Sequence, residues 1–433
     1  MNSIPDLETR PLAHIRQFQF LKLKETITYL ERYAPFYKRL FAQNNILVSD
    51  VNRWEDFVTL PTTSKDDIQK YNWDFLCVPR NQIKEFTSTS GTLGKPVTIG
   101  LTAQDMKRLA YNEYLSFACA DGSSQDLYQL MLTLDRQFMA GIAYYEGIRQ
   151  LGAGLIRVGP GLPAMQWGTI ERLKPTAVVA VPSFLVKMIE YAKQVGIDLN
   201  QSGIKKAICI GESIRSNDFF LNAIGKKIVQ GWDIKLFSTY ASTEMQTAFT
   251  ECNKGKGGHL HPELIYIEIL DENNIPVKPG DLGDVVITTF GVQGMPLLRY
   301  KTGDKAQLFE EPCSCGRTTA RLGPVVGRRQ HMIKLKGTTL YPPAIFETLH
   351  QVAGVKDYVV EVFSDELKSD VLKIFLLADE IHQQEIMEKL RSVFQSDIRV
   401  VPFFEFLSQP EIEQLQTGGD GRKIKKFIDR RTL

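Results

Sequence analysis

In the middle of the chain, short apolar runs alternate with amphipathic stretches, and few folds accommodate both patterns in alternation. Short apolar runs at 178–184, 205–211 and 234–240 are separated by amphipathic stretches such as 182–196. Strands that alternate with helices favour an α/β domain with a largely parallel sheet. From about 262 to 308 the apolar runs follow one another more closely, which predicts a β-rich subdomain. We therefore predict mixed sheets with packed helices.

Both ends of the chain follow other patterns. Apolar residues at helical spacing near the N-terminus, interrupted by Pro35, predict two helices or one kinked helix. After residue 337 a small α+β module is predicted, with helices near 342–352 and 380–396 and strands near 355–363, 371–378 and 399–407. One face of its second helix is expected to carry Ile381, Met387, Leu390 and Phe394.

Composition excludes several classes of protein. The 52 Lys plus Arg against 50 Asp plus Glu give a net charge of +2, which offers no electrostatic footprint for nucleic acid or an anionic membrane. No apolar run reaches the roughly 20 residues of a membrane span, and the first residues lack the regions of a signal peptide. Six cysteines are too few for a disulfide framework, so we expect a cytoplasmic protein. A length of 433 residues predicts more than one domain, and because the pattern changes at 327–337 we expect domains at 1–327 and 328–433.

Residues 87–96 read TSTSGTLGKP and carry the first chemical signal. Glycines let a backbone approach a ligand closely, while hydroxyls and a lysine donate to anionic oxygen. The segment is not a Walker A loop, because Gly91 and Gly94 are too close together and Pro96 replaces the Ser or Thr that binds magnesium. The segment therefore predicts a loop between two strands with donors for anionic oxygen, although taken alone this composition is more often that of a solvated turn.

Four segments together resemble the motifs of the adenylate-forming enzymes, the superfamily of acyl-CoA synthetases, luciferases and peptide-synthetase adenylation domains. They are the loop 87–96, YASTE at 240–244, YKTGD at 300–304, and Gly327-Arg328 with IKLKG at 333–337. Within the superfamily the chain is most similar to the phenylacetate–CoA ligase family, on APFYKRLF at 34–41, LPTTSKDDI at 60–68, CSCGR at 313–317 and FIDRR at 427–431. The resemblance covers essentially the whole chain. It implies a large N-terminal AMP-binding domain and a small mobile C-terminal lid.

The resemblance also implies an ATP site, residue by residue. Tyr240 would stack on adenine, Thr243 would contact the α-phosphate, Glu244 would bind Mg²⁺ and Asp304 would bind the ribose hydroxyls. Arg328 would reach ribose or phosphate from the linker. The loop 87–96 would hold the β- and γ-phosphates, and Gly211 and Glu212 would border the purine. The implied ATP-binding residues are Thr89, Ser90, Gly91, Thr92, Gly94, Lys95, Gly211, Glu212, Tyr240, Ala241, Ser242 and Asp304.

A catalytic lysine is implied near the C-terminus, where its cation would bridge the acid carboxylate and the α-phosphate. Aligning the family pattern on FID at 427–429 assigns this role to Lys423, although Arg422 rather than glycine precedes it. Lys425 is the alternative lysine, and a solvated basic tail is the alternative interpretation. Gln330 also stands where the family carries its hinge aspartate.

Two further sites are implied. The acid pocket would be formed by Phe138, Ala140, Gly141, Tyr144 and Pro182, where aromatic rings suit an aryl acid but are equally typical of a core. Related ligases also resemble this chain in a set of three cysteines and one histidine, Cys252, His259, Cys313 and Cys315. Such a set suits a closed structural Zn²⁺ site. His261 is the alternative imidazole, and four unrelated reduced side chains remain the alternative to a metal site.

The implied reaction has two halves. A small-molecule carboxylic acid and ATP would form an acyl-AMP and pyrophosphate, and the acyl group would then pass to CoA. We expect an aryl or arylacetic acid as substrate, and a monomer or a homodimer. The altered hinge keeps a carrier-protein phosphopantetheine or an amine open as the acceptor. The displaced glycine before Lys423 keeps a non-catalytic, nucleotide-binding relative open.

Overall fold

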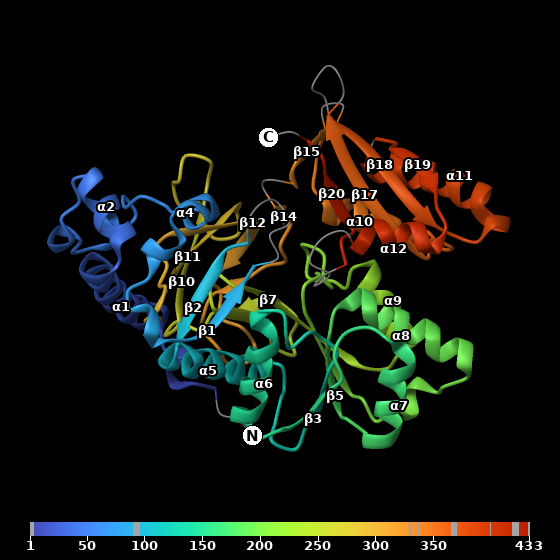
Figure 1. Cartoon of the computed structure of the whole chain (residues 1–433), viewed down its shortest axis with the longest axis horizontal. Coiled ribbons are helices and arrows are strands. Elements are labelled where there is room, and N and C mark those ends of the chain that lie inside the picture. Colours follow the sequence, from blue (N-terminus) through green and yellow to red (C-terminus); the bar gives the residue numbers. More distant parts are fainter. Residues whose placement is uncertain are drawn as a thin grey trace. The chain divides into compact units, whose positions relative to one another are not determined.

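The computed structural model describes the chain except residues 1–3, 90–95, 329–330, 336–337, 365–369, 399, 418–423 and 432–433. The chain divides into two compact units, Met1–Val325 and Val326–Leu433 (Figure 1). The boundary expected from the sequence, between 327 and 328, lies close to this division. No helix in the described part of the chain is both long enough and apolar enough to cross a bilayer.

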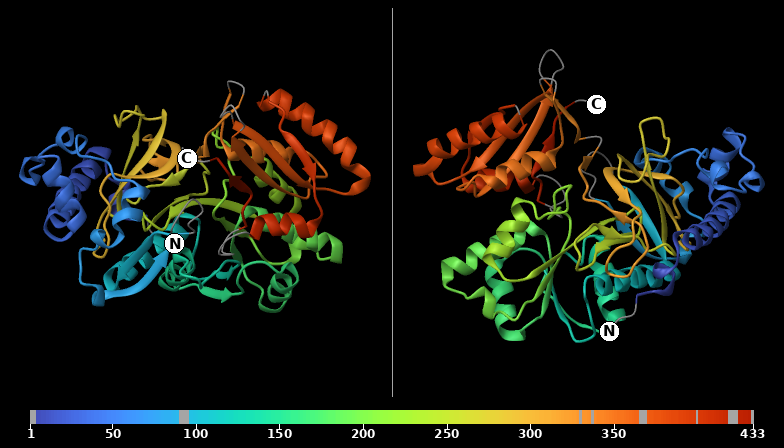
Figure 2. Two further views of the ribbon diagram at one scale, coloured as in Figure 1. Left: turned by 45° about the horizontal axis from the view of Figure 1, so that its top comes forward. Right: turned by 180° about the vertical axis from the view of Figure 1, so that it is seen from behind.

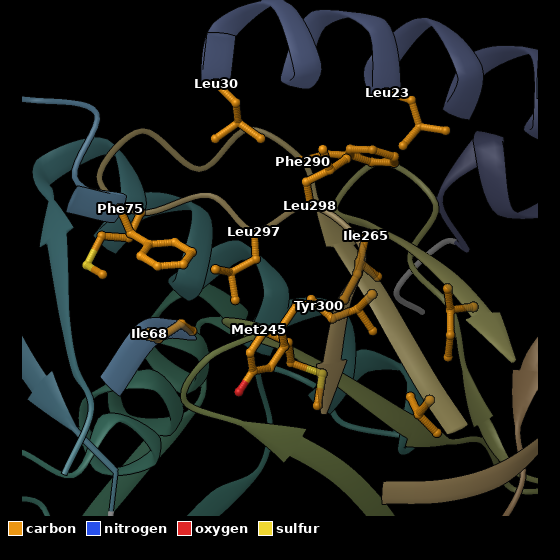
Figure 3. Packing of buried hydrophobic residues seen from close by; sticks show 14 of the residues in the cluster. Leu23, Leu30, Ile68, Phe75, Met245, Ile265, Phe290, Leu297, Leu298 and Tyr300 are labelled. Carbon is orange, nitrogen blue, oxygen red and sulfur yellow. The ribbon is translucent and has the colours of Figure 1, made fainter. Parts of the chain in front are cut away.

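The first unit begins with helices that Pro35 separates, as predicted. Helix α1 (Leu12–Tyr33) ends at the break, and Pro35 occupies the first position of α2 (Pro35–Gln43), where its missing N–H costs nothing. Two short helices follow, α3 (Trp54–Phe57) and α4 (Lys65–Tyr71). Leu23 and Leu30 of α1 pack with Ile265, Phe290 and Leu298 in one hydrophobic cluster, which Figure 3 shows from close by.

The segment predicted as strand, loop and strand is confirmed on both sides of residues 90–95. Strand β1 (Ile83–Ser88) pairs antiparallel with β2 (Thr98–Thr102), and Ser88 lies opposite Thr98. Helix α5 (Ala103–Cys119) follows directly and begins with a capping box. The Thr102 hydroxyl accepts from the Asp105 N–H (3.1 Å), while the Asp105 carboxylate accepts from the Thr102 N–H (2.8 Å).

A parallel sheet forms the centre of the first unit. Its neighbouring strands are β4 (Gly154–Arg157), β3 (Leu127–Leu130), β5 (Ala177–Ala180), β6 (Lys206–Cys209) and the first half of β7 (Lys235–Ser242). The chain between these strands forms α6 (Met139–Leu151), α7 (Pro163–Leu173), α8 (Pro182–Val195) and α9 (Ala223–Gly231). Figure 2 shows helices on both sides of the sheet. The prediction of a strand over 178–184 was wrong beyond Ala180, because Pro182 starts α8.

Both faces of this sheet are buried, which explains its continuous apolar runs. Val178 and Ala180 pack with α7, α8 and α9 in one hydrophobic cluster. Ala177 and Val179, on the opposite face, pack with side chains of α5 and α6 in another. All carboxyl ends of the parallel strands meet at one edge. The predicted pocket residue Pro182 follows β5 there, and residues of the predicted nucleotide site follow β6 and lie at the end of β7 and just beyond it.

The predicted β-rich subdomain is confirmed. Strand β7 continues beyond the parallel sheet, and its second half pairs antiparallel with β8 (Thr247–Glu251). The strand order continues through β9 (Gly258–His259), β13 (Arg321–Leu322), β12 (Tyr300–Phe309), β11 (Leu282–Thr289) and β10 (Ile265–Leu270), all antiparallel. Because β7 belongs to both arrangements, it joins the parallel sheet to the antiparallel strands.

The second unit is the predicted α+β module. It contains β14 (Gly327–Arg328), the hairpin of β15 (Ile333–Leu335) and β16 (Thr338–Leu340), and a sheet ordered β19-β18-β17-β20. These strands are β17 (Asp357–Ser364), β18 (Asp370–Leu377), β19 (Phe403–Phe406) and β20 (Phe427–Asp429), and the helices are α10 (Pro342–Gln351), α11 (Gln383–Val393) and α12 (Gln409–Thr417). The expectation that Ile381 faces the core was wrong: it precedes α11 in a 3₁₀ turn and is 91% exposed, while Ile386 takes the buried position.

Candidate active site and cysteine–histidine cluster

Thr243 and Glu244 lie in the tight loop 243–246 that joins β7 to β8. The Ser242 hydroxyl accepts from the Met245 N–H (3.3 Å), so this predicted ATP ligand caps the loop. Met245 is fully buried and packs in the hydrophobic core, which anchors the loop to the core. Glu244 is largely buried and Thr243 half-buried. The two predicted catalytic residues are therefore carried on a short, well-anchored turn.

Tyr240 and Asp304 come from different strands and meet directly. The Tyr240 hydroxyl donates to Oδ2 of Asp304 at 2.6 Å, which joins β7 to β12. The Tyr240 ring is half-buried and tilted against Phe249. The hydroxyl of Thr302 accepts from the Asp304 N–H (3.2 Å), where the pairing of β12 with β11 shifts its register. The structure thus brings together the residues predicted to contact adenine and ribose, although their roles stay predictions.

Gly211 and Glu212 follow β6 and lie against the start of α8. The Glu212 carboxylate accepts from the Ser183 N–H (2.9 Å) and from the Ser183 hydroxyl (2.8 Å). A carboxylate is stabilised at a helix N-terminus, where backbone N–H groups lack partners. Gly211 has a φ of +75°, which favours glycine. The predicted border of the purine therefore contacts the first turn of the helix that Pro182, a predicted pocket residue, begins.

Of the predicted phosphate ligands in the loop 87–96, only Thr89 lies among the described residues. Thr89 closes the neck of the hairpin, because its N–H donates to the Val97 carbonyl (2.9 Å) and its hydroxyl accepts from the Val97 N–H (3.0 Å). The other predicted ligands lie outside the described residues: Ser90, Gly91, Thr92, Gly94 and Lys95.

The predicted acid pocket begins at α6. Phe138 precedes the helix, Ala140 is half-buried, and a side chain at Gly141 would meet the Thr133 carbonyl at 2.4 Å. Tyr144 is buried, with its ring edge-on to Phe117. These positions establish close packing of α6, and a role in binding an acid stays a prediction.

Glu113 is a buried carboxylic acid in this region that sequence reasoning missed. It lies on α5 where Gly147 of α6 allows close approach, since a Cβ there would be 2.2 Å from Glu113 Cβ. Burial raises the pKa of Glu113 to about 8. Asn112 donates to its Oε1 (3.0 Å), whereas Oε2 has no hydrogen-bond partner among the described residues.

In the second unit, the two candidate lysines differ in what can be said of them. Lys423 lies outside the described residues. Lys425 is half-buried, and its backbone N–H donates to the Gln416 carbonyl (3.0 Å). The neighbouring Lys426 pairs with Asp357 (3.3 Å). Arg328 lies exposed on β14.

The four predicted metal ligands converge. The cysteine sulfurs and one ring nitrogen of Cys252, His259, Cys313 and Cys315 all lie within 4.8 Å of one another. Sγ of Cys252 lies 3.8 Å from Sγ of Cys313, and His259 Nε2 lies 3.4 Å from Cys252 Sγ and 3.6 Å from Cys315 Sγ. Tetrahedral Zn²⁺, with bonds of about 2.3 Å to sulfur and 2.0 Å to nitrogen, requires S···S near 3.8 Å and S···N near 3.5 Å. The donor set and its spacing fit that ion.

A buried network that sequence reasoning missed surrounds these ligands. Glu8 accepts from His261 Nδ1 (2.6 Å) and from Arg317 Nε (2.6 Å), while Arg317 also contacts Cys315 Sγ (3.7 Å). His261 is therefore engaged by Glu8, and His259 is the imidazole of the cluster. Burial alone would raise the pKa of Glu8, but His261 and Arg317 lower it. No local pattern could reveal this network, because Glu8 and His261 lie 253 residues apart.

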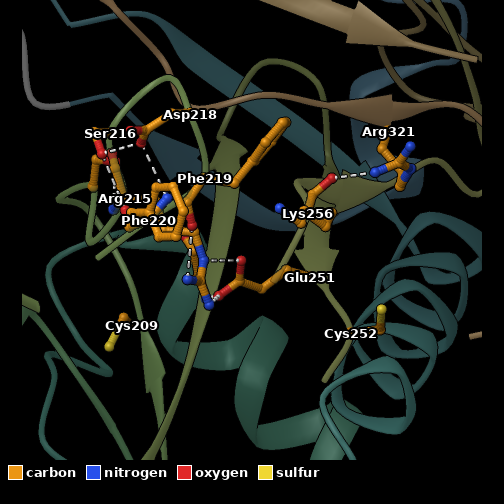
Figure 4. A network of polar contacts seen from close by, with 12 residues as sticks. Cys209, Arg215, Ser216, Asp218, Phe219, Phe220, Glu251, Cys252, Lys256 and Arg321 are labelled. Atoms are coloured by element: carbon orange, nitrogen blue, oxygen red, sulfur yellow. Dashed lines mark hydrogen bonds and ion pairs between the residues drawn. The ribbon is translucent and has the colours of Figure 1, made fainter. Parts of the chain in front are cut away.

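A second unpredicted ion pair supports the loop after Gly211 (Figure 4). Arg215 donates to Glu251 from Nε (2.7 Å) and from a terminal nitrogen (3.0 Å), and Glu251 also accepts from the Ser238 N–H (2.8 Å). Arg215 further donates to the Phe219 carbonyl (3.1 Å). The pair thus joins the loop after β6 to the end of β8.

The sequence model of the AMP-binding enzymes matches residues 38–294, more than half of the chain, so the chain belongs to that family. Phenylacetate–coenzyme A ligase of Thermus thermophilus is 28% identical over 398 residues, covering 89% of this chain and 88% of that protein. The Escherichia coli K12 enzyme of the same name is 25% identical over 353 residues, covering 79% and 78%. A crystal structure of 2-hydroxyisobutyryl-CoA ligase with 2-HIB-AMP has a TM-score of 0.86 at 22% identity, covering 99% of this chain and 94% of that one.

These likenesses confirm three predictions. The predicted fold, a large adenylate-forming domain followed by a small α+β domain, is shared along nearly the whole chain. The predicted family, adenylate-forming enzymes like the phenylacetate–CoA ligases, is confirmed. The predicted enzyme class, an AMP-forming acid–thiol ligase, follows from that family.

Proposed function

We propose that the chain activates an aryl or arylacetic acid with ATP and passes the acyl group to CoA. A carboxylate oxygen of the acid attacks the α-phosphorus, the bond to pyrophosphate breaks, and acyl-AMP forms. The CoA thiolate then attacks the acyl carbon and releases AMP. Family membership and relatives named phenylacetate–coenzyme A ligase support this assignment. The observation that carries it is the Tyr240–Asp304 contact, which joins two residues proposed for the nucleotide site from separate strands.

Each residue of the site has a proposed task. Asp304 accepts hydrogen bonds from the ribose hydroxyls, and Tyr240 covers one face of adenine while orienting the Asp304 carboxylate. Thr243 donates to the α-phosphate. Glu244 holds Mg²⁺, which supplies positive charge against the phosphate oxygens when it is bound. Gly211 and Glu212 border the purine, and the loop 87–96 holds the outer phosphates. Positioning and fixed charge provide most of the catalysis in such transfers.

The second unit is proposed to supply the remaining cations. Lys423 stabilises the charge that develops between the acid and the α-phosphate, and Arg328 contacts ribose or phosphate. Lys425 is the second candidate for the catalytic role. Replacing each lysine with alanine separates them, because the catalytic one should lower acyl-AMP formation at least about a hundredfold.

The acid is proposed to bind between α6 and the start of α8. The residues proposed to line it are Phe138, Ala140, Gly141, Tyr144 and Pro182, of which Phe138 is half-buried just before α6. An aryl ring would gain from contact with aromatic side chains in addition to its burial. The names of the curated relatives favour phenylacetate as the first acid to test.

The cysteine–histidine cluster is proposed to hold a structural Zn²⁺. Three sulfurs and one imidazole at tetrahedral spacing leave no coordination position for substrate, which distinguishes a structural from a catalytic zinc site. Hydrogen bonding between Cys252 and Cys315, reinforced by His259, lowers the pKa of Cys315 well below its usual value and raises that of Cys252 well above it. A thiolate is the form of cysteine that binds metal. Mass spectrometry of the native protein should therefore find one zinc ion per chain, and its absence would overturn the assignment.

AMP formation by the purified protein tests the proposed reaction. ATP, Mg²⁺ and a panel of aryl, arylacetic and fatty acids are supplied with CoA, and again with hydroxylamine to trap acyl-AMP. CoA-dependent turnover with phenylacetate or benzoate is expected. Hydroxamate without CoA-dependent turnover would transfer the acceptor role to a carrier protein or an amine. Turnover with fatty acids alone would overturn the aryl specificity.

A further inference from the structure

Arg108 on α5 is a buried cation to which no carboxylate of the described residues is hydrogen-bonded, although the charges of Asp105 and Glu263 favour its charged form. Its guanidinium donates to four oxygens that are all uncharged: the carbonyls of Phe290 (2.6 Å), Gln246 (2.7 Å) and Leu264 (2.6 Å), and the Thr247 hydroxyl (3.1 Å). Burying a guanidinium against neutral acceptors is costly compared with pairing it with a carboxylate. This arrangement therefore calls for an explanation beyond packing.

Two of these contacts reach the end of the loop that carries Thr243 and Glu244. Gln246 closes this loop with a φ of +49°, a left-handed conformation that costs a residue with a side chain about 1 kcal/mol. Arg108 donates to the carbonyl of that same residue and to the hydroxyl of the next, Thr247. The strained position is thus held from α5.

Other residues on the same face of α5 reinforce the attachment. Asn112, four residues after Arg108, accepts from the Ala248 N–H (3.1 Å) just beyond the loop. Asp105, three residues before, accepts from the Gln293 N–H (2.7 Å) and the Gly294 N–H (2.9 Å). Spacings of three and four place the three side chains on one face of the helix. This face of α5 therefore holds the backbone at the end of the loop 243–246 and the backbone near Phe290 in fixed positions relative to each other.

We propose that Arg108 is a positioning residue for the adenylation site. By holding the Gln246 carbonyl, it keeps the loop 243–246 in the conformation that presents Glu244 to the Mg²⁺ of bound MgATP. Arg108 itself touches none of the reacting atoms. The inference rests on the proposed role of Glu244 as the Mg²⁺ ligand.

Calorimetric titration tests this without knowledge of the acid. ATP is titrated into the full-length protein in Mg²⁺ and again in EDTA, and the ratio of the two affinities measures the magnesium contribution. Arg108→Lys keeps the charge, but an ammonium with three donors cannot reproduce the fork of the guanidinium. We expect the ratio to fall about tenfold, as for the loss of one or two buried hydrogen bonds.

A second substitution distinguishes positioning from general destabilisation. Glycine adopts a left-handed φ readily, so Gln246→Gly added to Arg108→Lys should restore the ratio to within about threefold of the wild type. Lys206→Met serves as the control, because it breaks a half-buried ion pair with Asp126 (2.9 Å) at the amino edge of the parallel sheet. It should lower the melting temperature and leave the ratio unchanged.

The outcomes distinguish the positioning role of Arg108 from the proposed Mg²⁺-binding role of Glu244. A normal ratio in Arg108→Lys, or a double variant no better than the single one, would overturn the positioning role alone. A wild type that binds ATP equally with and without Mg²⁺ would overturn the role of Glu244 and this inference with it. If Arg108→Lys does not fold, Thr247→Val removes one contact of Arg108 and should lower the ratio about threefold. An unchanged ratio there would also overturn the proposal.

Discussion

A hydrogen bond between two exposed side chains adds little to stability, because water can replace either partner. The contact between Tyr240 and Asp304 differs, because it is partly shielded from water. Half-buried at the end of β7, the Tyr240 hydroxyl instead restricts the Asp304 carboxylate to one orientation (2.6 Å). That restriction is useful only if the second carboxylate oxygen must meet a ligand at a defined place. The pair therefore leads to a prediction about ribose.

Tyr240→Phe keeps the ring but removes the hydroxyl that orients Asp304. We expect the affinity for ATP to fall about fivefold, with a smaller change for 2′-deoxy-ATP, since one hydrogen bond contributes about 1 kcal/mol. Calorimetric titration with both nucleotides measures the effect. Tyr128→Phe is the matched control, because the Tyr128 hydroxyl is buried and lacks a partner in the described part of the chain. Equal losses in the two variants would contradict the assignment of Asp304 to ribose.

The raised pKa of Glu113 makes the stability of the protein depend on pH. The folded value of about 8 exceeds the ordinary value of 4.5 because burial disfavours the charged form. Between these two values the unfolded chain has lost a proton that the folded chain retains. Raising the pH through this range therefore favours unfolding, by at most about 1.4 kcal/mol per pH unit. Above pH 8 the penalty stays constant.

Glu113→Gln should remove this component while keeping an acceptor for Asn112. We expect the variant and the wild type to be closest in stability near pH 5. The variant should become the more stable protein, progressively, up to pH 8. Urea unfolding at pH 5, 6, 7 and 8 gives the difference in free energy. Parallel profiles would show that the carboxyl group ionises in the folded protein at its ordinary pKa.

At the scale of elements, the short N-terminal helical turn at Asp6–Thr9 is tied to the cysteine–histidine cluster. Its Glu8 pairs with His261 and with Arg317, and Arg317 contacts Cys315. Three thiolates around Zn²⁺ would carry a net negative charge, which the Arg317 cation can balance. Residues outside the ligand set often influence metal affinity in this way.

Glu8→Gln should weaken metal retention without touching a ligand. We expect zinc transfer to a chromogenic chelator to be about tenfold faster, because a neutral amide has one acceptor oxygen in place of the two carboxylate oxygens that accept from His261 and Arg317. Asp6→Asn is the matched control, since Asp6 belongs to the same turn but forms an exposed pair with Arg10. If both variants release zinc at the wild-type rate, Glu8 has no influence on the site.

Element boundaries also show how local signals act. Pro35 and Pro182 start helices where their fixed φ and missing N–H are tolerated, so the break before α2 could be predicted from the sequence. At Pro182 the predicted strand 178–184 overlaps the amphipathic stretch 182–196, and the proline belongs to the helix. Ile381 matched a helical spacing but lies before the first turn of α11. Spacing alone does not define where a helix begins.

At the scale of the whole molecule, the two units have separate hydrophobic cores. Ile374 of β18 is fully buried in a cluster formed within the second unit, and Val178 of β5 is fully buried in a cluster of the first. Each core unites side chains of its own unit. A cavity made in the core of one unit should therefore lower the stability of that unit and leave the stability of the other unchanged.

Ile374→Ala and Val178→Ala test this independence. Scanning calorimetry should resolve two transitions, and each variant should lower only one of them, a different one in each case. Cavities of this kind cost about 2–4 kcal/mol within the affected unit. A single transition that both substitutions lower would mean that the two units unfold cooperatively.

The sequence by itself determined the features that depend on near neighbours. The alternation of strands and helices, the hairpin around the phosphate loop and the family motifs could be predicted because spacing, glycines and prolines act over a few residues. The cysteine–histidine set could be proposed from its donor types, with the imidazole left open.

Only the tertiary structure decided which distant groups meet. Arg108 and Gln246 lie 138 residues apart, Glu8 and His261 lie 253 apart, and Arg215 and Glu251 lie 36 apart. A charged residue on an amphipathic helix is ordinarily expected to face water. Whether it is buried instead, and which backbone carbonyl then accepts a hydrogen bond from it, depends on how the helix packs against strands from elsewhere in the chain. Local sequence patterns cannot predict that packing, because it depends on residues far apart in the chain.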